Sequence, residues 1–151
     1  MVRSILDDVL IVELAQDVAG PYGSKLLADQ GANVIKIEPI TGDTSRQWGP
    51  FPDDIPHIER SLSYAYYNTN KKGITLNIDS DKGKGLLRRL IEQADIFIED
   101  IAPSRKSMYG IDDLSLSNPD LVHVSVTPFG SAGSYQDYAG VEIIYQALAG
   151  F

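Results

Sequence analysis

The first segment that could do chemistry follows the apolar run at residues 9–14. Gly20 and Pro21 come a few residues after this run, and proline is favoured in the first turn of a helix. The unpaired amides and the dipole at the start of such a helix favour an anionic or strongly polar group. Glu38 ends the next apolar run, about where an acid that binds a ribose would stand. A dinucleotide site is therefore the first interpretation to test.

The glycine pattern of a dinucleotide site is missing from this turn. Gly20 and Gly23 do not have the spacing of G-x-G-x-x-G, and Glu38 without those glycines is a weak signal. A tight turn followed by a solvated strand end explains these residues better than an NAD site. A nucleotide-binding oxidoreductase domain stays open as an alternative.

Two other features carry charges that could act on a ligand. Lys71 and Lys72 form a local positive spot, which as a bare pattern is more typical of a solvated turn. Glu142 stands in the first turn of the last predicted helix, where the helix dipole favours an acid in any protein.

No spacing of His, Asp and Glu indicates a metal site. The chain has no cysteine, which excludes disulfides, thiolate metal ligands and a cysteine nucleophile.

Charge and composition narrow the classes of partner. The 151 residues carry a formal net charge of −8, and a field of that sign repels nucleic acid and anionic membranes. The hydrophobic share of 43% is ordinary for a globular domain, and no apolar run approaches the length of a membrane span. We therefore expect no nucleic acid and no membrane partner, and the cysteine-free composition suits the cytoplasm.

Strand and helix patterns alternate along the chain. Short apolar runs predict strands at residues 9–14, 33–38, 74–78, 96–99 and 121–126. Helices are predicted at residues 21–30, 80–94, 112–117 and 141–149, with Gly31 as a left-handed stop. This alternation predicts an α/β fold, an open, mostly parallel Rossmann-like sheet with helices on both faces.

Such a sheet positions ligands at the carboxyl ends of its strands. The loops predicted there are residues 15–21, 79–80, 100–104 and 127–140, while the proline-rich residues 39–60 are expected to be irregular. The last helix is expected to bury one apolar face, formed by Ile143, Ile144, Ala147 and Leu148.

The string AGPYGSKLLADQGANVIKIE at residues 19–38 resembles the opening of the class III CoA-transferases. This family includes formyl-CoA:oxalate transferase, carnitine CoA-transferase and α-methylacyl-CoA racemase. Six further stretches resemble the family in the same order: residues 6–14, 42–50, 67–78, 94–104, 118–135 and 140–150. The similarity covers nearly the whole chain.

The resemblance implies a reaction and an architecture. Members bind CoA across the carboxyl ends of the strands, and an aspartate attacks the acyl-CoA thioester. That aspartate lies beyond the helix that opens at Glu142, so it is expected after residue 151. Residues 1–151 are then the amino-terminal part of the large CoA-binding α/β domain of a chain that forms an interlocked homodimer. The implied substrates are an acyl-CoA and a carboxylic acid, with no metal.

The resemblance also implies site residues. Glu142 would support the reacting carboxylate, and Lys71 and Lys72 would attract the phosphates of CoA. The residues implied in CoA binding are Val18, Ala19, Gly20, Pro21, Lys71, Lys72, Leu76, Asp100 and Ile101.

Several positions depart from the family pattern. Val18 replaces a glutamine, Pro39 an arginine and Asp79 a common lysine, and Met108 stands near another CoA-binding arginine. Each change removes a phosphate partner or adds repulsion. Val141 stands where the racemase branch has a histidine, which disfavours an acyl-CoA racemase. A non-catalytic module that binds CoA or pairs with another subunit is a further alternative.

Overall fold

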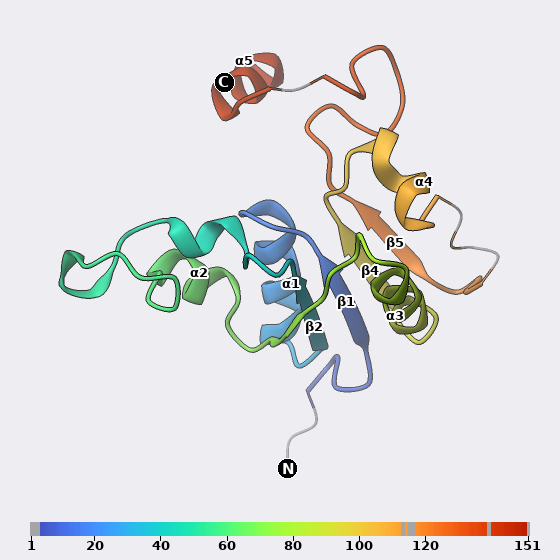
Figure 1. The fold of residues 1–151 in the computed structure, drawn as a ribbon, viewed down its shortest axis with the longest axis horizontal. Helices are drawn as coiled ribbons and strands as arrows, with labels where there is room; N and C mark the ends of the chain where they lie inside the picture. The colour runs from blue at the N-terminus through green and yellow to red at the C-terminus, as the bar shows by residue number, and fades with distance from the viewer. Residues whose placement is uncertain (1–3, 113, 115–116, 139, 151) are drawn as a thin grey trace.

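The fold is built on one five-stranded sheet (Figure 1). The computed structural model describes residues 4–112, 114, 117–138 and 140–150. The strand order is β3-β2-β1-β4-β5, and every neighbouring pair is parallel. This confirms the predicted open sheet, in which all five strands are parallel. The strands are β1 (Leu10–Leu14), β2 (Asn33–Glu38), β3 (Lys72–Thr75), β4 (Ile96–Glu99) and β5 (Val122–Ser125).

Helices connect these strands. The α-helices are α1 (Ala19–Asp29), α2 (Leu62–Tyr67), α3 (Asp81–Ile91), α4 (Lys106–Tyr109) and α5 (Glu142–Ala149). The short 3-10 helices are η1 (Thr44–Gln47), η2 (Pro52–Asp54) and η3 (Pro103–Arg105).

The two faces of the sheet bury separate apolar cores because side chains alternate along each strand. Val12 and Leu14 of β1 pack in one cluster with Leu87 of α3. Ile11 belongs to the other cluster, with Ala28 of α1. This arrangement confirms that helices cover both faces of the sheet.

Helix α1 lies unusually close to the end of β1. A Cβ atom added at Gly20 would come within 2.4 Å of the Cβ of Ala15, so only glycine allows this approach. The helix ends at Asp29 with Gln30 as its C-cap, and Gly31 follows with φ of +101°. The predicted left-handed stop is confirmed, while the helix begins two residues before Pro21.

Some predicted boundaries differ from the structure. The third strand lies at Lys72–Thr75, not at residues 74–78, because the chain leaves β2 once Leu76 N has donated to Glu38 O. Helix α2 was not predicted. The helix predicted at residues 112–117 falls partly on residues 113, 115 and 116, which lie outside the described residues. Just before it, the short helix α4 ends at Gly110 with φ of +68°.

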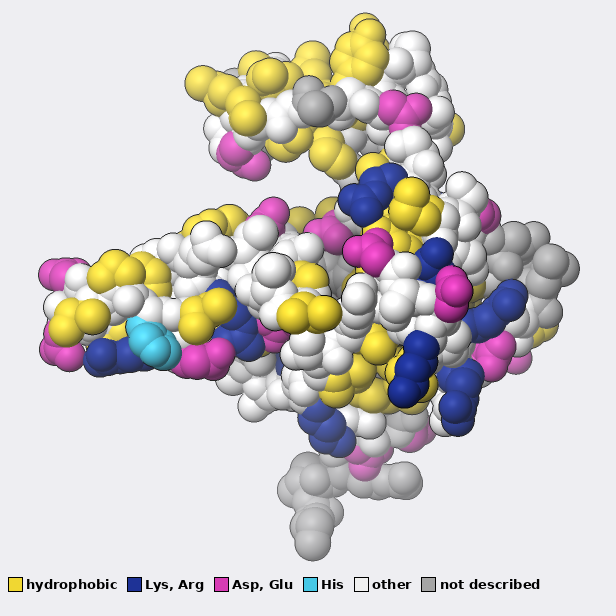
Figure 2. Space-filling model, viewed as in Figure 1, with side chains coloured by type: hydrophobic (Ala, Val, Ile, Leu, Met, Phe, Trp, Pro, Cys, Tyr) yellow, Lys and Arg dark blue, Asp and Glu magenta, His cyan; other side chains and the backbone are white. Residues whose placement is uncertain are grey.

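The prediction of a buried face on α5 is wrong. Ile143 and Leu148 are 73% and 71% exposed, and Ile144 and Ala147 are exposed as well. The physical reason is visible in Figure 1, where α5 stands apart from the sheet, so its apolar stripe has no core to pack against. Figure 2 shows hydrophobic side chains gathered on this outlying part of the molecule.

Candidate functional site

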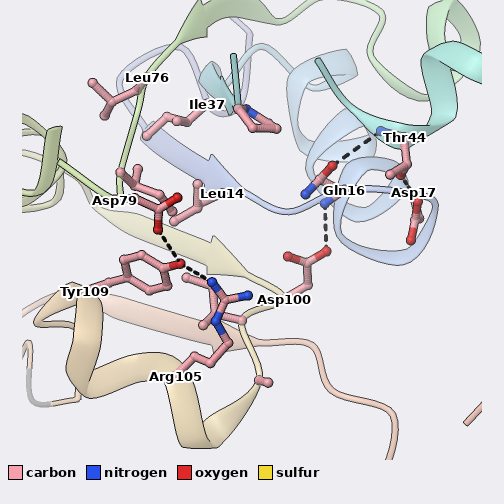
Figure 3. Close-up of a pocket in the computed structure, with 14 residues that line it drawn as sticks. Leu14, Gln16, Asp17, Ile37, Thr44, Leu76, Asp79, Asp100, Arg105 and Tyr109 are labelled. Carbon is pink, nitrogen blue, oxygen red and sulfur yellow. Dashed lines mark hydrogen bonds between the residues drawn. The ribbon is translucent and has the colours of Figure 1, made fainter. Parts of the chain in front are cut away.

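A cavity of about 460 Å³ opens at the carboxyl ends of the strands (Figure 3). Its walls come from the segments that follow β1, β2, β3 and β4, where ligands bind on open parallel sheets. The volume lies within the range of small-molecule sites. The lining residues are Leu14, Gln16, Asp17, Ile37, Pro39, Thr44, Leu76, Ile78, Asp79, Asp100, Ile101, Ala102, Arg105 and Tyr109.

The polar wall after β1 is fixed by hydrogen bonds to neighbouring segments. Gln16 N donates to Asp100 Oδ2 at 2.8 Å, which joins the ends of β1 and β4. Thr44 N donates to Gln16 Oε1 at 3.3 Å, and the Thr44 hydroxyl donates to Asp17 Oδ1. These contacts tie the β1–α1 turn to η1 and hold Asp17 at the cavity.

The wall after β3 is a tight turn that ends at the start of α3. Ser80 Oγ donates to Asn77 O at 2.8 Å and accepts from Gly83 N at 3.1 Å, which caps the helix. Asp79 N donates to Asn77 Oδ1 at 3.1 Å. The turn thereby presents Leu76, Ile78 and Asp79 to the cavity.

A chain of hydrogen bonds links the β3 and β4 walls across the cavity. Tyr109 OH donates to Asp79 Oδ1 at 3.0 Å and accepts from an Nη2 hydrogen of Arg105. Tyr109 is only 7% exposed and belongs to the apolar core next to Leu87. The phenol therefore has a fixed position from which it orients both charged partners (Figure 3).

Asp100 is the lining acid with the strongest electrostatic perturbation. Burial raises the pKa of its carboxyl to about 6, against the opposing hydrogen bond from Gln16 N, and Asp17 adds repulsion. In the folded protein the carboxyl keeps its proton at pH values where the unfolded chain has lost it. Folding stability therefore falls as pH rises from 3.8 to about 6 and is not regained above that range.

We expect Asp100→Asn to remove this pH dependence. The asparagine oxygen can still accept from Gln16 N, but no buried negative charge develops near pH 7. The variant should gain about 1–2 kcal/mol of unfolding free energy at pH 7.5, measured by chemical denaturation from pH 4 to pH 8. Asp120→Asn, in an exposed turn before β5, is the matched control. A stability profile for Asp100→Asn that still declines between pH 4 and pH 6 like the wild type would contradict this assignment.

Buried charges on the α1 side of the sheet anchor the segments around the cavity. Glu13 is 0% exposed, and its two carboxylate oxygens lie 2.9 Å from Lys36 Nζ and 2.8 Å from Lys71 Nζ. Lys36 Nζ also pairs with Asp43 Oδ2 at 2.7 Å, and Ser24 of α1 donates to Glu13 at 2.5 Å. The group joins β1, β2, α1 and the segments after β2 and α2.

A second ionic group fixes the proline-rich segment after β2. Arg46 makes two hydrogen bonds to Glu38, at 2.7 and 2.9 Å, and its guanidinium lies 3.8 Å from the ring centroid of Tyr64. The pKa of Glu38 falls to about 2, since hydrogen bonds from Arg46 and Tyr64 outweigh the cost of burial. This network holds Arg46 of η1 and Tyr64 of α2 against Glu38, the last residue of β2.

The structure places only some of the site residues predicted from the sequence at the cavity. Leu76, Asp100 and Ile101 line the cavity. The residues Val18, Ala19, Gly20 and Pro21 form the start of α1, one residue beyond the lining Asp17.

The lysines and the helix acid lie elsewhere. Lys71 has its ammonium 2.8 Å from Pro21 O as well as from Glu13, and burial lowers its pKa to about 8. Lys72 is exposed at the first residue of β3, at the end of the strand opposite the cavity. Glu142 is exposed on α5 and accepts from Gln146 Nε2 at 2.9 Å. None of the three lines the cavity.

Sequence reasoning missed several lining residues. Gln16 and Asp17 lie in a loop that was predicted to carry ligands, but neither was named. Arg105 lies one residue past the predicted loop 100–104, and Tyr109 lies in the unpredicted helix α4. The only signal for Arg105 in the sequence is a basic residue shortly after a predicted strand end. In the loop predicted at residues 127–140, the described residues 127–138 and 140 contribute no lining residue.

Two structural features are absent from the described residues. No helix there is both long and apolar enough to cross a membrane. No group of three or more His, Cys, Asp or Glu side chains in the described part of the chain could hold a metal ion.

Comparison with known proteins gives one consistent result. The family model described as CoA-transferase family III matches residues 6–151. A succinate–glutarate CoA-transferase of Agrobacterium fabrum is 40% identical over 97% of this chain, which covers 38% of that relative. The human succinyl-CoA:glutarate CoA-transferase is 34% identical over 96% of this chain, which covers 33% of that relative. The chain therefore spans less than two fifths of the length of these relatives.

A solved structure of a related protein has the same fold. The crystal structure of a CAIB/BAIF family protein from Brucella suis matches with a TM-score of 0.87 at 35% identity. The match covers 97% of this chain and 39% of that one.

Proposed function

Because the chain belongs to CoA-transferase family III, we propose that residues 1–151 are the amino-terminal part of an enzyme that moves CoA between carboxylic acids. The observation that carries the proposal is the cavity at the carboxyl ends of β1 to β4. Three of its walls come from the loops that the sequence alone predicted to bind a ligand, and the family match spans all of its residues.

The cavity has features suited to part of a CoA molecule. Its apolar side chains, such as Leu76 and Ile101, can pack against the adenine ring or the pantetheine arm. The carboxylates of Asp17 and Asp79 can accept hydrogen bonds from hydroxyl and amino groups. We propose that this cavity is the CoA site and that the amides at the start of α1 contribute to its rim.

We place the nucleophilic carboxylate outside residues 1–151. Support comes from the family resemblance and from relatives more than twice as long as this chain. The carboxylate attacks the thioester carbonyl and expels CoA thiolate, which leaves an acyl anhydride on the enzyme. CoA thiolate then attacks the enzyme side of the anhydride, the first acid leaves, and an enzyme-bound CoA thioester remains. A second carboxylate takes over the CoA by the reverse sequence.

Two measurements test this division of labour, with succinyl-CoA and glutarate as first substrates. The purified 151-residue chain should show no transfer of CoA. The longer protein, incubated with acyl-CoA and hydroxylamine, should be modified at one carboxylate outside residues 1–151. Turnover by the short chain, or modification of Asp17, Asp79 or Asp100, would overturn the proposal.

A second candidate is a non-catalytic module that pairs with another subunit. The observation that favours it is the exposure of apolar side chains on β5 and α5, including Val122 at 55% and Ile143 at 73%. We also propose that the enzyme forms a homodimer through this surface and that it acts in the cytoplasm. Sedimentation at several concentrations separates the cases, since a strictly monomeric chain that does not bind CoA would count against both functions.

A further inference from the structure

The cavity has an unusual balance of charge for a site that takes an anionic ligand. Three aspartates, Asp17, Asp79 and Asp100, are among its lining residues. Among the described residues that line it, Arg105 is the only lysine or arginine. A phosphate that enters this cavity would meet repulsion from the carboxylates unless it lies against Arg105.

Arg105 also differs from four other cations near the sheet. Lys36 and Lys71 pair with Glu13, Arg46 with Glu38, and Lys106 with Glu99 at 2.6 Å. Within the described ranges, no carboxylate forms an ion pair with Arg105. No ion pair within those ranges therefore competes with a ligand for its guanidinium.

The guanidinium of Arg105 is also oriented. Tyr109 accepts one of its hydrogen bonds, and the Tyr109 ring centroid lies 5.5 Å from the guanidinium carbon. A guanidinium has five N–H donors, so the contact with Tyr109 leaves others for a ligand. Figure 3 shows the guanidinium between Tyr109 and Asp100, pointing into the space that the lining residues enclose.

We propose that Arg105 binds a phosphate group of CoA and that Asp79, acting through Tyr109, is its positioning residue. This inference rests on the proposed CoA-binding function and adds the group that recognises the ligand. Arginine suits the role because its planar fork matches two phosphate oxygens at once. The carboxylate of Asp79 orients the phenol but also weakens the local positive potential, so the two residues should have opposite effects on affinity.

The test is a calorimetric titration of the 151-residue chain with CoA, 3′-dephospho-CoA and pantetheine. Arg105→Gln should weaken CoA binding about 10- to 100-fold and leave pantetheine binding unchanged. Asp79→Asn keeps an oxygen for Tyr109 but removes a negative charge, and it should tighten CoA binding by about 3- to 10-fold. Arg89→Gln, in the last turn of α3 and outside the cavity lining, is the matched control.

The three ligands identify the phosphate. A loss that appears with CoA but not with 3′-dephospho-CoA assigns Arg105 to the 3′-phosphate. A loss shared by both assigns it to the pyrophosphate, and either result supports the inference.

Failure of the inference can be told apart from failure of the proposed function. If the wild-type chain does not bind CoA, the proposed function fails and the inference falls with it. If the wild type binds CoA and Arg105→Gln binds it as tightly as Arg89→Gln does, only the inference is overturned. Should Arg105→Gln not fold, Asp79→Asn decides: tighter CoA binding with unchanged pantetheine binding supports the inference, and any other result overturns it.

Discussion

Gly83→Ala should lower the unfolding free energy by about 2–4 kcal/mol. Gly83 lies in the first turn of α3, where an added Cβ would come within 1.8 Å of Asn77 O and 2.6 Å of Asn77 C. Both atoms belong to the backbone of the turn after β3, so the clash cannot be relieved by a side-chain rotation. The turn would have to move, and with it the cavity wall that carries Leu76 and Asp79.

Gly85→Ala is the matched control for this prediction. Gly85 lies two residues later in the same helix, is exposed, and has no atom within 4 Å of an added Cβ. Alanine is the better helix former, so this variant should gain about 0.5–1 kcal/mol. Urea unfolding followed by circular dichroism gives both values. Equal effects of the two substitutions would show that the turn after β3 is not packed as described.

Glu13→Gln should cost about 3–5 kcal/mol of unfolding free energy. The buried group holds two carboxylates, Glu13 and Asp43, against two ammonium groups, Lys36 and Lys71. The substitution leaves one positive charge without a partner in a site from which water is excluded. The amide hydrogens of the glutamine would also face an ammonium group, which cannot accept them.

A second substitution tests whether charge balance is the cause. Lys71→Met added to Glu13→Gln removes the surplus charge, so the double variant should recover part of the lost stability. Glu92→Gln, at the C-cap of α3, is the control, because the Glu92 oxygen lies 3.9 Å from Arg88 Nε on an exposed surface and contributes little. The account would be contradicted if Glu13→Gln lost no more unfolding free energy than Glu92→Gln. It would also be contradicted if the double variant were less stable than both Glu13→Gln and Lys71→Met.

The strands could be predicted from the sequence because their apolar runs are short and dense. Residues 9–14 and 33–38 contain β-branched side chains and end at turn residues, and β1 and β2 lie within those ranges. The pattern does not reveal that Glu13 and Lys36 are buried inside those strands. Charged residues at alternate positions usually face water, and only the pairing across neighbouring strands removes them from it.

The short helices and the exposed face of α5 could not be predicted for different reasons. Helix α4 has four residues, too few for a periodic pattern, and its limits depend on the left-handed Gly110. The stripe on α5 has the right spacing, but spacing alone does not supply a core on which to pack. Tertiary contacts decide both cases.

The candidate site was predicted at the level of loops and only partly at the level of residues. The predicted strand ends gave the positions of three walls of the cavity, because the carboxyl ends of parallel strands lie at one edge of the sheet. The roles given to Lys71 and Lys72 came from the family resemblance and their charge, neither of which shows what an ammonium group pairs with in the fold. In the structure Lys71 forms an ion pair with Glu13, and Lys72 lies at the end of β3 away from the cavity. Arg105 lines the cavity and has no acidic partner in the described ranges.

Hydrogen–deuterium exchange of the 151-residue chain with and without CoA tests whether the cavity is the CoA site. CoA should slow exchange at the amides of residues 76–79 and 100–105, the two segments that face each other across the cavity. The amides of α5 around Glu142 should exchange at unchanged rates. Protection confined to α5, or no protection at residues 76–79 and 100–105 at saturating CoA, would contradict the assignment of this cavity to CoA.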